Sequence, residues 1–513
     1  MFPCGFKTFG RLPVGSGYHG PVTKWPGKLF LVLAVAAAML MATAGPAMAA
    51  PPDLKVDGSR IVDETTGEEF IPRGVNWPSF EYACIQGWGY SNFGATPSTA
   101  AVMKEWGINT VRIPINQDCW LGDDDQPISD SLLFTPNAAG YQGAIESFVE
   151  FLNDEDIAVV LDLHWTGKNG TVADGLRPMA DERSDNFWSS VATSFRDNPS
   201  LMFDLFNEPH SRWDPDRSQW AFRQSWHCWA NGGCTAPDQP DTETRIDGST
   251  YTTVGMKSLV AAVRETGAEQ PVILGGLDYA NDLSGWKANA PNDDQMIASF
   301  HNYPGKPCGV QSCWNQEIAT LATDVPVLTG EVGQNDCESG FTSRYLNWAD
   351  EHGIGYLAWA WWDLTGTPSD PGLGCRNFAL IQDLDGTPTV PYGSDYRAHL
   401  LAPLDELPPP VIREPAALKI ISAKAKGGKI RATYRLNPLA TGRTVSHLVI
   451  GKGRRRVKVK GTAPIDAGRS NITMTVRRGW KAKKIIASYP GNELVESDVS
   501  SRRPLIVKPK RKP

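Results

Sequence analysis

The sequence predicts an α/β protein, namely a (β/α)8 TIM barrel followed by a small C-terminal all-β sandwich. Two observations carry this prediction. Apolar runs of strand length alternate with amphipathic helical patterns across residues 50–402, and such alternation is typical of a parallel sheet with crossover helices. Beyond the proline-rich segment 403–413, the apolar runs become short and alternating, separated by Gly, Asn and Pro. That spacing indicates an antiparallel sandwich.

Eight strand–helix repeats are expected in the barrel. The candidate strands are 71–76, 109–113, 157–163, 201–206, 271–275, 296–300, 325–330 and 354–361. Helical patterns lie between them, for instance at 97–106, 138–154, 183–196, 251–266 and 341–352. Eight repeats over about 340 residues fit a closed barrel with insertions. An open doubly wound sheet is the alternative, but no glycine-rich phosphate loop follows an early strand.

Two segments stand outside this alternation. Residues 54–70 read as a hairpin that precedes the first barrel strand. The longest insertion, about 207–250, follows the fourth strand. It contains four tryptophans, Trp213, Trp220, Trp226 and Trp229. They either form the core of a small subdomain, or at least one of them is a platform on which a sugar stacks.

Residues 1–49 have the features of a secretory signal peptide. Lys24 and Lys28 precede an apolar run from Leu29 to Met41, and Ala47-Met48-Ala49 follows it. A membrane anchor is the alternative, but an uninterrupted span usually needs about 20 apolar residues. We therefore expect a secreted, extracellular protein with no membrane span once the signal is removed.

Cysteine usage agrees with export. Eight cysteines follow the signal peptide: Cys84, Cys119, Cys228, Cys234, Cys308, Cys313, Cys337 and Cys375. An even number in an exported chain implies disulfides. Proximity favours Cys228–Cys234 and Cys308–Cys313, and the pairs Cys84–Cys119 and Cys337–Cys375 are what remains. Zinc is the competing interpretation, but the chain has no Cys-x-x-Cys pair to support it.

Charge divides the chain into an acidic body and a basic module. From Val411 to the end there are 26 Lys and Arg against 5 Asp and Glu, a balance of +21. The whole-chain totals of 50 and 57 therefore leave 24 and 52 for residues 1–410, a balance of −28. The predicted organisation is a signal peptide at 1–49, the barrel at 50–402, a linker at 403–413, a basic β-sandwich at 414–507 and a basic tail at 508–513.

Two of the apolar runs end on a glutamate. LMFDLFNEPH at 201–210 places Glu208 at the end of the fourth strand, and VPVLTGEVG at 325–333 places Glu331 at the end of the seventh. The carboxyl ends of barrel strands form the active face. Strands four and seven lie on opposite sides of the barrel, so these carboxylates can face each other across its mouth. Two such carboxylates are the minimum equipment for hydrolysing a glycosidic bond.

Residues at other strand ends extend this pattern, and together they resemble family 5 glycoside hydrolases, the cellulase-like enzymes with acid/base and nucleophile on strands four and seven. The resemblance covers about 54–402 and rests on eight positions. They are Arg112 in TVRIP, His164 in DLHW, Asn207 and Glu208 in NEP, His301 and Tyr303 in FHNY, Glu331 in LTGEVG and Trp361 in AWAW. It implies that Glu208 is the acid/base, that Glu331 is the nucleophile, and that no cofactor is needed.

The positions around the two acids also have physical reasons. Glu208 must be protonated near neutral pH, so we expect desolvation to raise its pKa, while Glu331 must stay ionised. Arg112 and Tyr303 can hold Glu331 charged and oriented through charge-assisted hydrogen bonds. Asn207 can donate to the sugar 2-hydroxyl, a contact that strengthens in the transition state.

The remaining positions are expected at the sugar. His164 and His301 can bond sugar hydroxyls or tune the acid. Trp361 offers an apolar face for the pyranose in the cleaved subsite. Trp359 and Trp362 are close enough in the sequence that this assignment could shift by one or two positions.

Three other interpretations compete. His164, His301 and a carboxylate could ligate a metal, but no His-x-His or His-Glu-x-x-His spacing supports this, so no metal site is expected. Asp123-Asp124-Asp125 lacks the twelve-residue calcium-loop pattern with its closing glutamate. A non-catalytic carbohydrate-binding protein on a barrel without activity is the third.

The basic module contains the run ASYPGNELVESDVSS, which resembles bacterial immunoglobulin-like (Ig-like) modules of exported enzymes. Its positive charge suits binding to an anionic cell-envelope polymer, and a solubilising spacer is the alternative. Because the module has no aligned set of aromatic residues, carbohydrate binding is not favoured. Nucleic acid fits the charge but not the compartment, so no nucleic-acid partner is expected.

These observations predict a secreted, retaining β-glycoside hydrolase that acts by double displacement on a β-linked polysaccharide or oligosaccharide. An endo-β-1,4-glucanase (cellulase) is the first expectation, because β-glucans are what the family most often cleaves. A β-mannanase and an exo-acting β-glycosidase of the same family stay open, since substrate choice depends on loops.

Overall fold

The computed structural model describes two parts of the chain. The described residues are 51–91, 94–122, 137–243, 245–336, 338–363 and 378–403, and then 418–426, 429–436, 443–450, 457–466, 469–475, 482–489, 498–499, 503–504 and 506–507. The predicted signal peptide, the linker beyond residue 403, the acidic run at 123–125 and the basic tail lie outside them. Among the described residues, no helix is long and apolar enough to cross a membrane.

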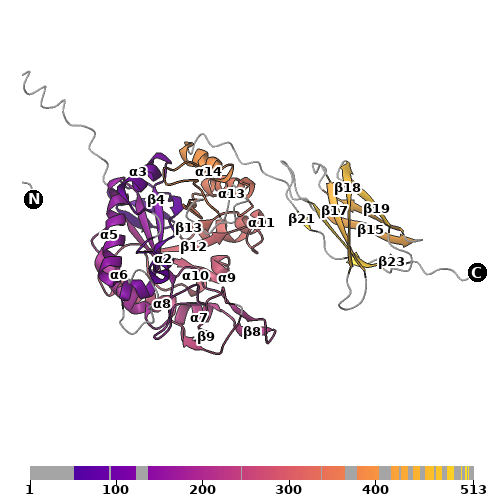
Figure 1. Cartoon of the computed structure of the whole chain (residues 1–513). Coiled ribbons are helices and arrows are strands. Elements are labelled where there is room, and N and C mark those ends of the chain that lie inside the picture. The colour runs from indigo at the N-terminus through magenta and orange to yellow at the C-terminus, as the bar shows by residue number, and fades with distance from the viewer. Residues whose placement is uncertain are drawn as a thin grey trace, which may run out of the picture. The chain divides into compact units, whose positions relative to one another are not determined.

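Eight parallel strands close into a barrel, which confirms the predicted fold class (Figure 1). In order around the barrel they are β3 (Arg73–Asn76), β4 (Thr110–Asn116), β5 (Ala158–Trp165), β6 (Leu201–Asp204), β11 (Val272–Gly275), β12 (Met296–Asn302), β13 (Val327–Val332) and β14 (Gly355–Ala358). Each falls on one of the eight predicted runs. The strands are rich in apolar residues because a parallel sheet is buried on both faces, and their polar residues, such as Arg112, Asp162 and Glu331, are buried as well.

Alternate residues of each strand serve two separate cores. In β5, Val159 and Leu161 pack outward against the surrounding helices, whereas Ala158 and Val160 point into the barrel. The inner cluster also takes up side chains from the predicted hairpin, which is formed by β1 (Leu54–Asp57) and β2 (Arg60–Asp63). The hairpin therefore closes one end of the barrel and leaves the carboxyl ends of the strands open.

Helices cover the outside of the barrel (Figure 1). Helix α5 (Ala138–Asp154) buries Tyr141, Ile145, Phe148, Val149 and Leu152, the spacing of one helical face, and Asn137 caps it by accepting from Gly140 N. The other helices are α2 (Phe80–Gln86), α3 (Pro97–Glu105), α4 (Gln117–Leu121), α6 (Ser184–Phe195), α7 (Trp226–Asn231), α8 (Met256–Arg264), α9 (Leu277–Ala280), α10 (Trp286–Asn289), α11 (Gln311–Cys313), η1 (Trp314–Ile318), α12 (Ala319–Ala322), α13 (Gly340–Glu351) and α14 (Tyr392–Leu401).

The insertion after β6 forms a small subdomain of its own. Strands β7 (Arg212–Asp214) and β8 (Gln219–Phe222) make one hairpin, and β9 (Thr235–Pro237) pairs with β10 (Thr250–Thr252). The helix expected at 251–266 therefore begins later, at Met256. Its first predicted residues belong to β10, because the Thr-Tyr-Thr segment pairs as a strand before Gly255 starts α8.

Three of the four predicted disulfides are present, Cys84–Cys119, Cys228–Cys234 and Cys308–Cys313. Each cross-link mainly restricts the unfolded chain and so stabilises the fold. The fourth predicted pair, Cys337–Cys375, lies outside the described residues.

The C-terminal part is all-β, as predicted. Its main strands are β15 (Lys419–Lys426), β16 (Lys429–Arg435), β17 (Arg443–Ile450), β18 (Val457–Asp466), β19 (Arg469–Thr475) and β20 (Ala482–Tyr489), with the short strands β21 (Asp498–Val499), β22 (Arg503–Pro504) and β23 (Ile506–Val507). The sequence missed β18, whose apolar alternation is interrupted by Gly461 and Pro464. β18 pairs with both β17 and β19 and so joins the two halves of the sheet. The Ig-like character of this part stays a prediction.

Candidate active site

The carboxyl ends of the barrel strands gather seven of the eight predicted positions into one polar site. Arg112 lies on β4, His164 on β5, His301 on β12 and Glu331 on β13, while Glu208 follows β6. The strand ends open into a pocket of about 590 Å3. It is lined by His164, Leu176, Asn207, Glu208, Asp241, Tyr279, Tyr303, Pro304, Lys306, Glu331, Asn335, Trp359 and Phe378.

Glu331 is held by a hydrogen bond to each carboxylate oxygen. Arg112 Nη1 donates to Oε1 at 3.0 Å, and the Tyr303 hydroxyl donates to Oε2 at 2.7 Å. The side chain is buried. A buried carboxylate with a cation on one oxygen and a hydroxyl donor on the other has one orientation.

Arg112 is the centre of a larger buried network. Its Nε donates to Asp204 at 2.9 Å and its Nη2 lies 3.0 Å from Asp162. Two amide oxygens complete the set, Asn76 Oδ1 at 2.9 Å and Asn207 Oδ1 at 2.7 Å. Because the oxygen of Asn207 is engaged by the guanidinium, its Nδ2 donors are left for the pocket that Asn207 lines.

Three carboxyl groups share the single positive charge of Arg112. Burial raises the pKa of both Asp162 and Asp204, and Arg112 lowers it. The pKa of Arg112 stays above its ordinary value because these carboxylates and Glu331 outweigh its own desolvation. The ion pairs at 2.9–3.0 Å therefore hold the guanidinium charged, while the surplus of carboxyls favours retention of a proton within the cluster.

Glu208 has a different environment from Glu331. Burial raises its pKa to about 7, and the positive charge of Lys306 opposes this rise. His301 Nδ1 lies 2.9 Å from Glu208 Oε1 and 3.5 Å from Glu331 Oε2, so one imidazole touches both carboxyls. Glu208 is thus a carboxyl group that can hold or release a proton near neutral pH.

Both histidines are neutral at that pH. Burial lowers the pKa of His301 to about 3 and that of His164 to about 4. His301 is therefore a neutral hydrogen-bonding group beside Glu208 rather than a fixed cation. His164 Nδ1 lies 2.6 Å from Asp162 Oδ2, which fixes its ring, and His164 lines the pocket.

The two glutamates lie close together. A carboxylate oxygen of Glu208, one of Glu331 and a ring nitrogen of His301 all lie within 4.8 Å of one another. Such a group could in principle hold a cation. Glu331 already receives donors on both oxygens, and a metal ion would have to compete with the adjacent charge of Arg112. The arrangement fits a pair of carboxyls in different hydrogen-bonding environments better than a ligand set.

The predicted contact between Trp361 and the sugar is wrong. Trp361 was expected to face the sugar, but it is buried and packs edge-on against Trp106, with ring centroids 4.9 Å apart. Trp359 lines the pocket instead and lies parallel to His164, with centroids 5.7 Å apart. The prediction carried the eighth strand to residue 361, whereas β14 ends at Ala358 and the following side chains no longer alternate as in a strand.

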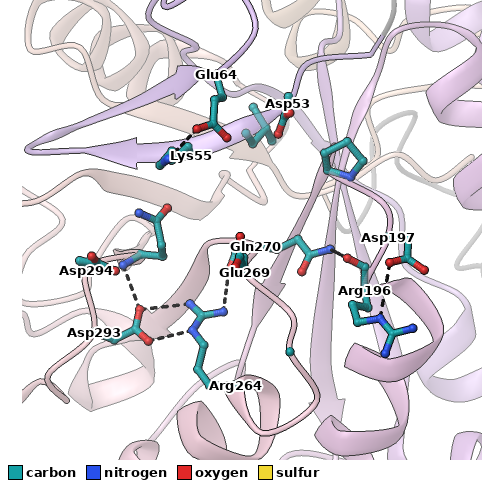
Figure 2. A pocket seen from close by; sticks show the side chains of 14 residues that line it. Asp53, Lys55, Glu64, Arg196, Asp197, Arg264, Glu269, Gln270, Asp293 and Asp294 are labelled. Atoms are coloured by element: carbon teal, nitrogen blue, oxygen red, sulfur yellow. Dashed lines mark hydrogen bonds and ion pairs between the residues drawn. The ribbon is translucent and has the colours of Figure 1, made fainter.

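A larger hollow, of about 690 Å3, lies away from these residues (Figure 2). It is formed by the β1–β2 hairpin and the segments that lead into the amino ends of barrel strands. Its charged groups pair among themselves, as Lys55 does with Glu64 at 2.6 Å and Arg264 with Asp293 at 2.8 Å. In a barrel of this kind the amino end serves stability, and no predicted site residue lines this hollow.

Sequence reasoning missed several members of the site. Asp162 and Asp204 were visible as single acids inside apolar strands, a position that burial makes costly without a partner. Asn76 ends β3 in the same manner. Lys306 comes from a loop and Tyr279 from the short α9, and no sequence period predicts which residues of such connecting segments turn toward a pocket.

A family model described as cellulase (glycosyl hydrolase family 5) matches residues 63–365, more than half of the chain. The chain belongs to glycosyl hydrolase family 5. Similar solved structures include a β-glucanase from Saccharophagus degradans, 20% identical over 68% of this chain and 92% of that one, with a TM-score of 0.48. An endoglucanase catalytic domain from Thermobifida fusca is 14% identical over 68% and 97%, with a TM-score of 0.46. This family 5 protein is therefore a glycosyl hydrolase with an eight-stranded barrel.

Proposed function

We propose that this family 5 hydrolase is a secreted, retaining endo-β-1,4-glucanase. One observation carries the mechanism: the oxygens of Glu208 and Glu331 approach within 4.8 Å across one pocket. Retaining glycosidases place their carboxyls about 5–5.5 Å apart, whereas inverting ones need about 6.5–9.5 Å to admit a water. The short separation supports double displacement.

In the first step, Glu331 attacks the anomeric carbon while Glu208 gives its proton to the departing glycosidic oxygen. The bond from the anomeric carbon to that oxygen breaks as the bond to Glu331 forms. A pKa of about 7 keeps Glu208 protonated in mildly acidic solution. Arg112 and Tyr303 keep Glu331 aimed, and Asn207 Nδ2 can donate to the sugar 2-hydroxyl.

In the second step, Glu208 is ionised and takes a proton from a water that attacks the glycosyl-enzyme. The product keeps its anomeric configuration, and both acids return to their starting states. No cofactor enters either step. Trp359 gives the pyranose an apolar face, and His164 offers Nε2 to a hydroxyl.

The substrate assignment has separate support. The matching family model is named for cellulase, and the pocket combines hydrogen-bonding side chains with the aromatic rings of Trp359, Tyr303 and Phe378. Such a lining suits the hydroxyl rims and apolar faces of β-linked pyranoses. Secretion is supported by the residue pattern at 1–49 and by the three disulfides.

The proposal is tested on the purified full-length protein. A reducing-sugar screen on cellulose, mixed-linkage glucan, mannan and small aryl glycosides should show β-glucan as the best substrate, and preference for mannan or for aryl glycosides alone would overturn the assignment. NMR of the first product should show the β-anomer, and the α-anomer would mean inversion. Glu331→Ala and Glu208→Gln should each lower kcat by roughly 10³-fold or more with the fold unchanged.

Three further measurements test the class of protein and its export. Activity should survive exhaustive chelation, and its loss would favour metal-assisted hydrolysis at the Glu208–His301–Glu331 group. Intact mass of the exported protein should correspond to a chain that begins near residue 50, and retention of residues 1–49 would contradict a cleaved signal peptide. Binding of soluble β-glucan with no hydrolysis at any pH would favour a non-catalytic binding protein.

A further inference from the structure

The four tryptophans of the insertion fall into two pairs with opposite exposure. Trp229 is fully buried, donates from Nε1 to Gly275 O at 2.8 Å and packs edge-on against Trp226. Trp213 and Trp220 are 44% and 42% exposed. The first pair packs into the main hydrophobic core of the barrel. The second pair has no packing role that explains two large apolar rings on the surface.

The exposed pair sits on a well-anchored hairpin. Trp213 on β7 pairs in register with Trp220 on β8, and their rings lie edge-on with centroids 5.3 Å apart. The Arg223 guanidinium lies over the Trp220 ring, 5.1 Å from its centroid. Figure 1 shows β8 at the outer edge of the subdomain, beyond α7 and β9. These contacts hold both rings in place while leaving much of their surface to solvent.

The base of the hairpin is fixed to the subdomain. Arg212 donates to the carbonyls of Pro240, Asp241 and Glu243. On the second strand, Phe222 pairs in register with Arg212 and packs in a small core with Ala236 and Tyr251. Two side-chain groups at the base therefore prevent the hairpin from swinging, so the position of its rings is set by the fold.

The base of the hairpin lies next to the catalytic pocket. It starts four residues after Glu208, at Arg212. A second hollow of about 450 Å3 is lined by Ser211 and Gln224 at the hairpin base, together with Asp278 and Pro307. The chain neighbours of these last two residues, Tyr279 and Lys306, line the catalytic pocket. The hairpin base also contacts the catalytic pocket directly, because Arg212 donates to the carbonyl of Asp241 and the residue Asp241 lines that pocket.

We propose that Trp213 and Trp220 form a distal glycan-binding site for the same β-glucan chain that is cut at Glu208. The occupant is a pyranose stretch of that chain beyond the catalytic pocket, whose apolar ring faces cover the exposed indoles. This rests on the proposed function. A chain held at two places has a high effective concentration at each, so the site favours long polymers over short oligosaccharides and supports cleavage within chains.

The test uses the full-length protein and the variants Trp213→Ala, Trp220→Ala and the double variant. The measured quantity is the ratio of kcat/KM on long soluble β-glucan to kcat/KM on a cello-oligosaccharide of four units. The double variant should lower this ratio about tenfold, with each single variant between it and the wild type. Leu384→Ala, which removes a side chain that is 43% exposed elsewhere on the surface, is the control and should leave the ratio unchanged.

Native electrophoresis in gels that contain β-glucan measures binding of the polysaccharide separately from its hydrolysis. The wild type should be retarded and the double variant should lose most of that retardation. An unchanged ratio together with unchanged retardation would overturn the proposal. Analytical ultracentrifugation tests whether a second copy of the chain occupies this surface instead. If the wild type dimerises and the double variant is monomeric, the two tryptophans form a self-association surface and the proposal is wrong. A wild type that is retarded but cleaves no β-glucan would contradict the proposed function alone.

Discussion

Replacing the proposed acid should make the barrel more stable at alkaline pH. Burial raises the pKa of Glu208 from 4.5 to about 7, since its side chain is only 13% exposed and loses hydration that the charged form needs. A difference of this size between the unfolded and folded states corresponds to about 3 kcal/mol. Glu208→Gln removes the ionisation and with it this cost.

The direction of the shift sets the pH window. Below about pH 4.5 the carboxyl is protonated in both states, so it contributes no difference. Between about pH 4.5 and 7 the unfolded chain releases the proton while the folded barrel keeps it, so stability falls as pH rises. Above about pH 7 both states are ionised and the full cost is present.

Denaturation in guanidinium chloride, followed by tryptophan fluorescence, measures the free energy of unfolding. At pH 8, Glu208→Gln should exceed the wild type by on the order of 3 kcal/mol, and near pH 4.5 the two should coincide. Glu146→Gln, at an exposed position of α5, is the control and should not show this pattern. Equal stability of the wild type and Glu208→Gln at pH 8 would refute the reasoning that burial keeps this acid protonated.

Three further outcomes are expected. Gly330→Ala places a Cβ 2.7 Å from Ser299 Oγ and 3.0 Å from Nε2 of His301, whose ring contacts Glu208. The value of kcat/KM should therefore fall about tenfold or more. The control Gly143→Ala, whose added Cβ has nothing within 4 Å, should leave kcat/KM unchanged. Trp361→Ala should lower the free energy of unfolding by about 3–5 kcal/mol, whereas Trp359→Ala should raise KM with little effect on unfolding. A raised KM in Trp361→Ala together with lost stability in Trp359→Ala would mean that Trp361 faces the sugar after all. Retention of the full-length protein on an anionic polysaccharide should fall as NaCl rises from about 50 to about 500 mM, and salt-independent retention would contradict an electrostatic role for the basic module.

The barrel could be predicted because buried parallel strands read as continuous apolar runs. Each of the eight runs became a strand, and the residue at each strand end followed from the position of the run. His164, Glu208 and Glu331 lie at or just beyond strand ends as expected, whereas Arg112 lies inside β4, which continues to Asn116. The prediction for Trp361 failed because the end of the last strand was misplaced. Strand β14 ends at Ala358, and Trp361 is buried rather than facing the sugar.

Two features could not be predicted from the sequence: the fold of the loops, and the sharing of the Arg112 charge among several carboxyl groups. The prediction supplied Arg112 as a partner for Glu331, but not that Asp162 and Asp204 compete for the same guanidinium. Such a network depends on which side chains meet inside the barrel, and no local pattern encodes it. The exposure of Trp213 and the burial of Trp229 likewise depend on how the insertion folds.

The role of Glu331 is tested most directly by trapping the covalent intermediate. A 2-deoxy-2-fluoro cellobioside with a good leaving group slows hydrolysis of the glycosyl-enzyme, and peptide mass spectrometry then locates the sugar. We predict one adduct per chain, on the peptide that contains Glu331, and none in Glu331→Gln. An adduct on another carboxylate, or inactivation without any covalent sugar, would contradict double displacement at this site.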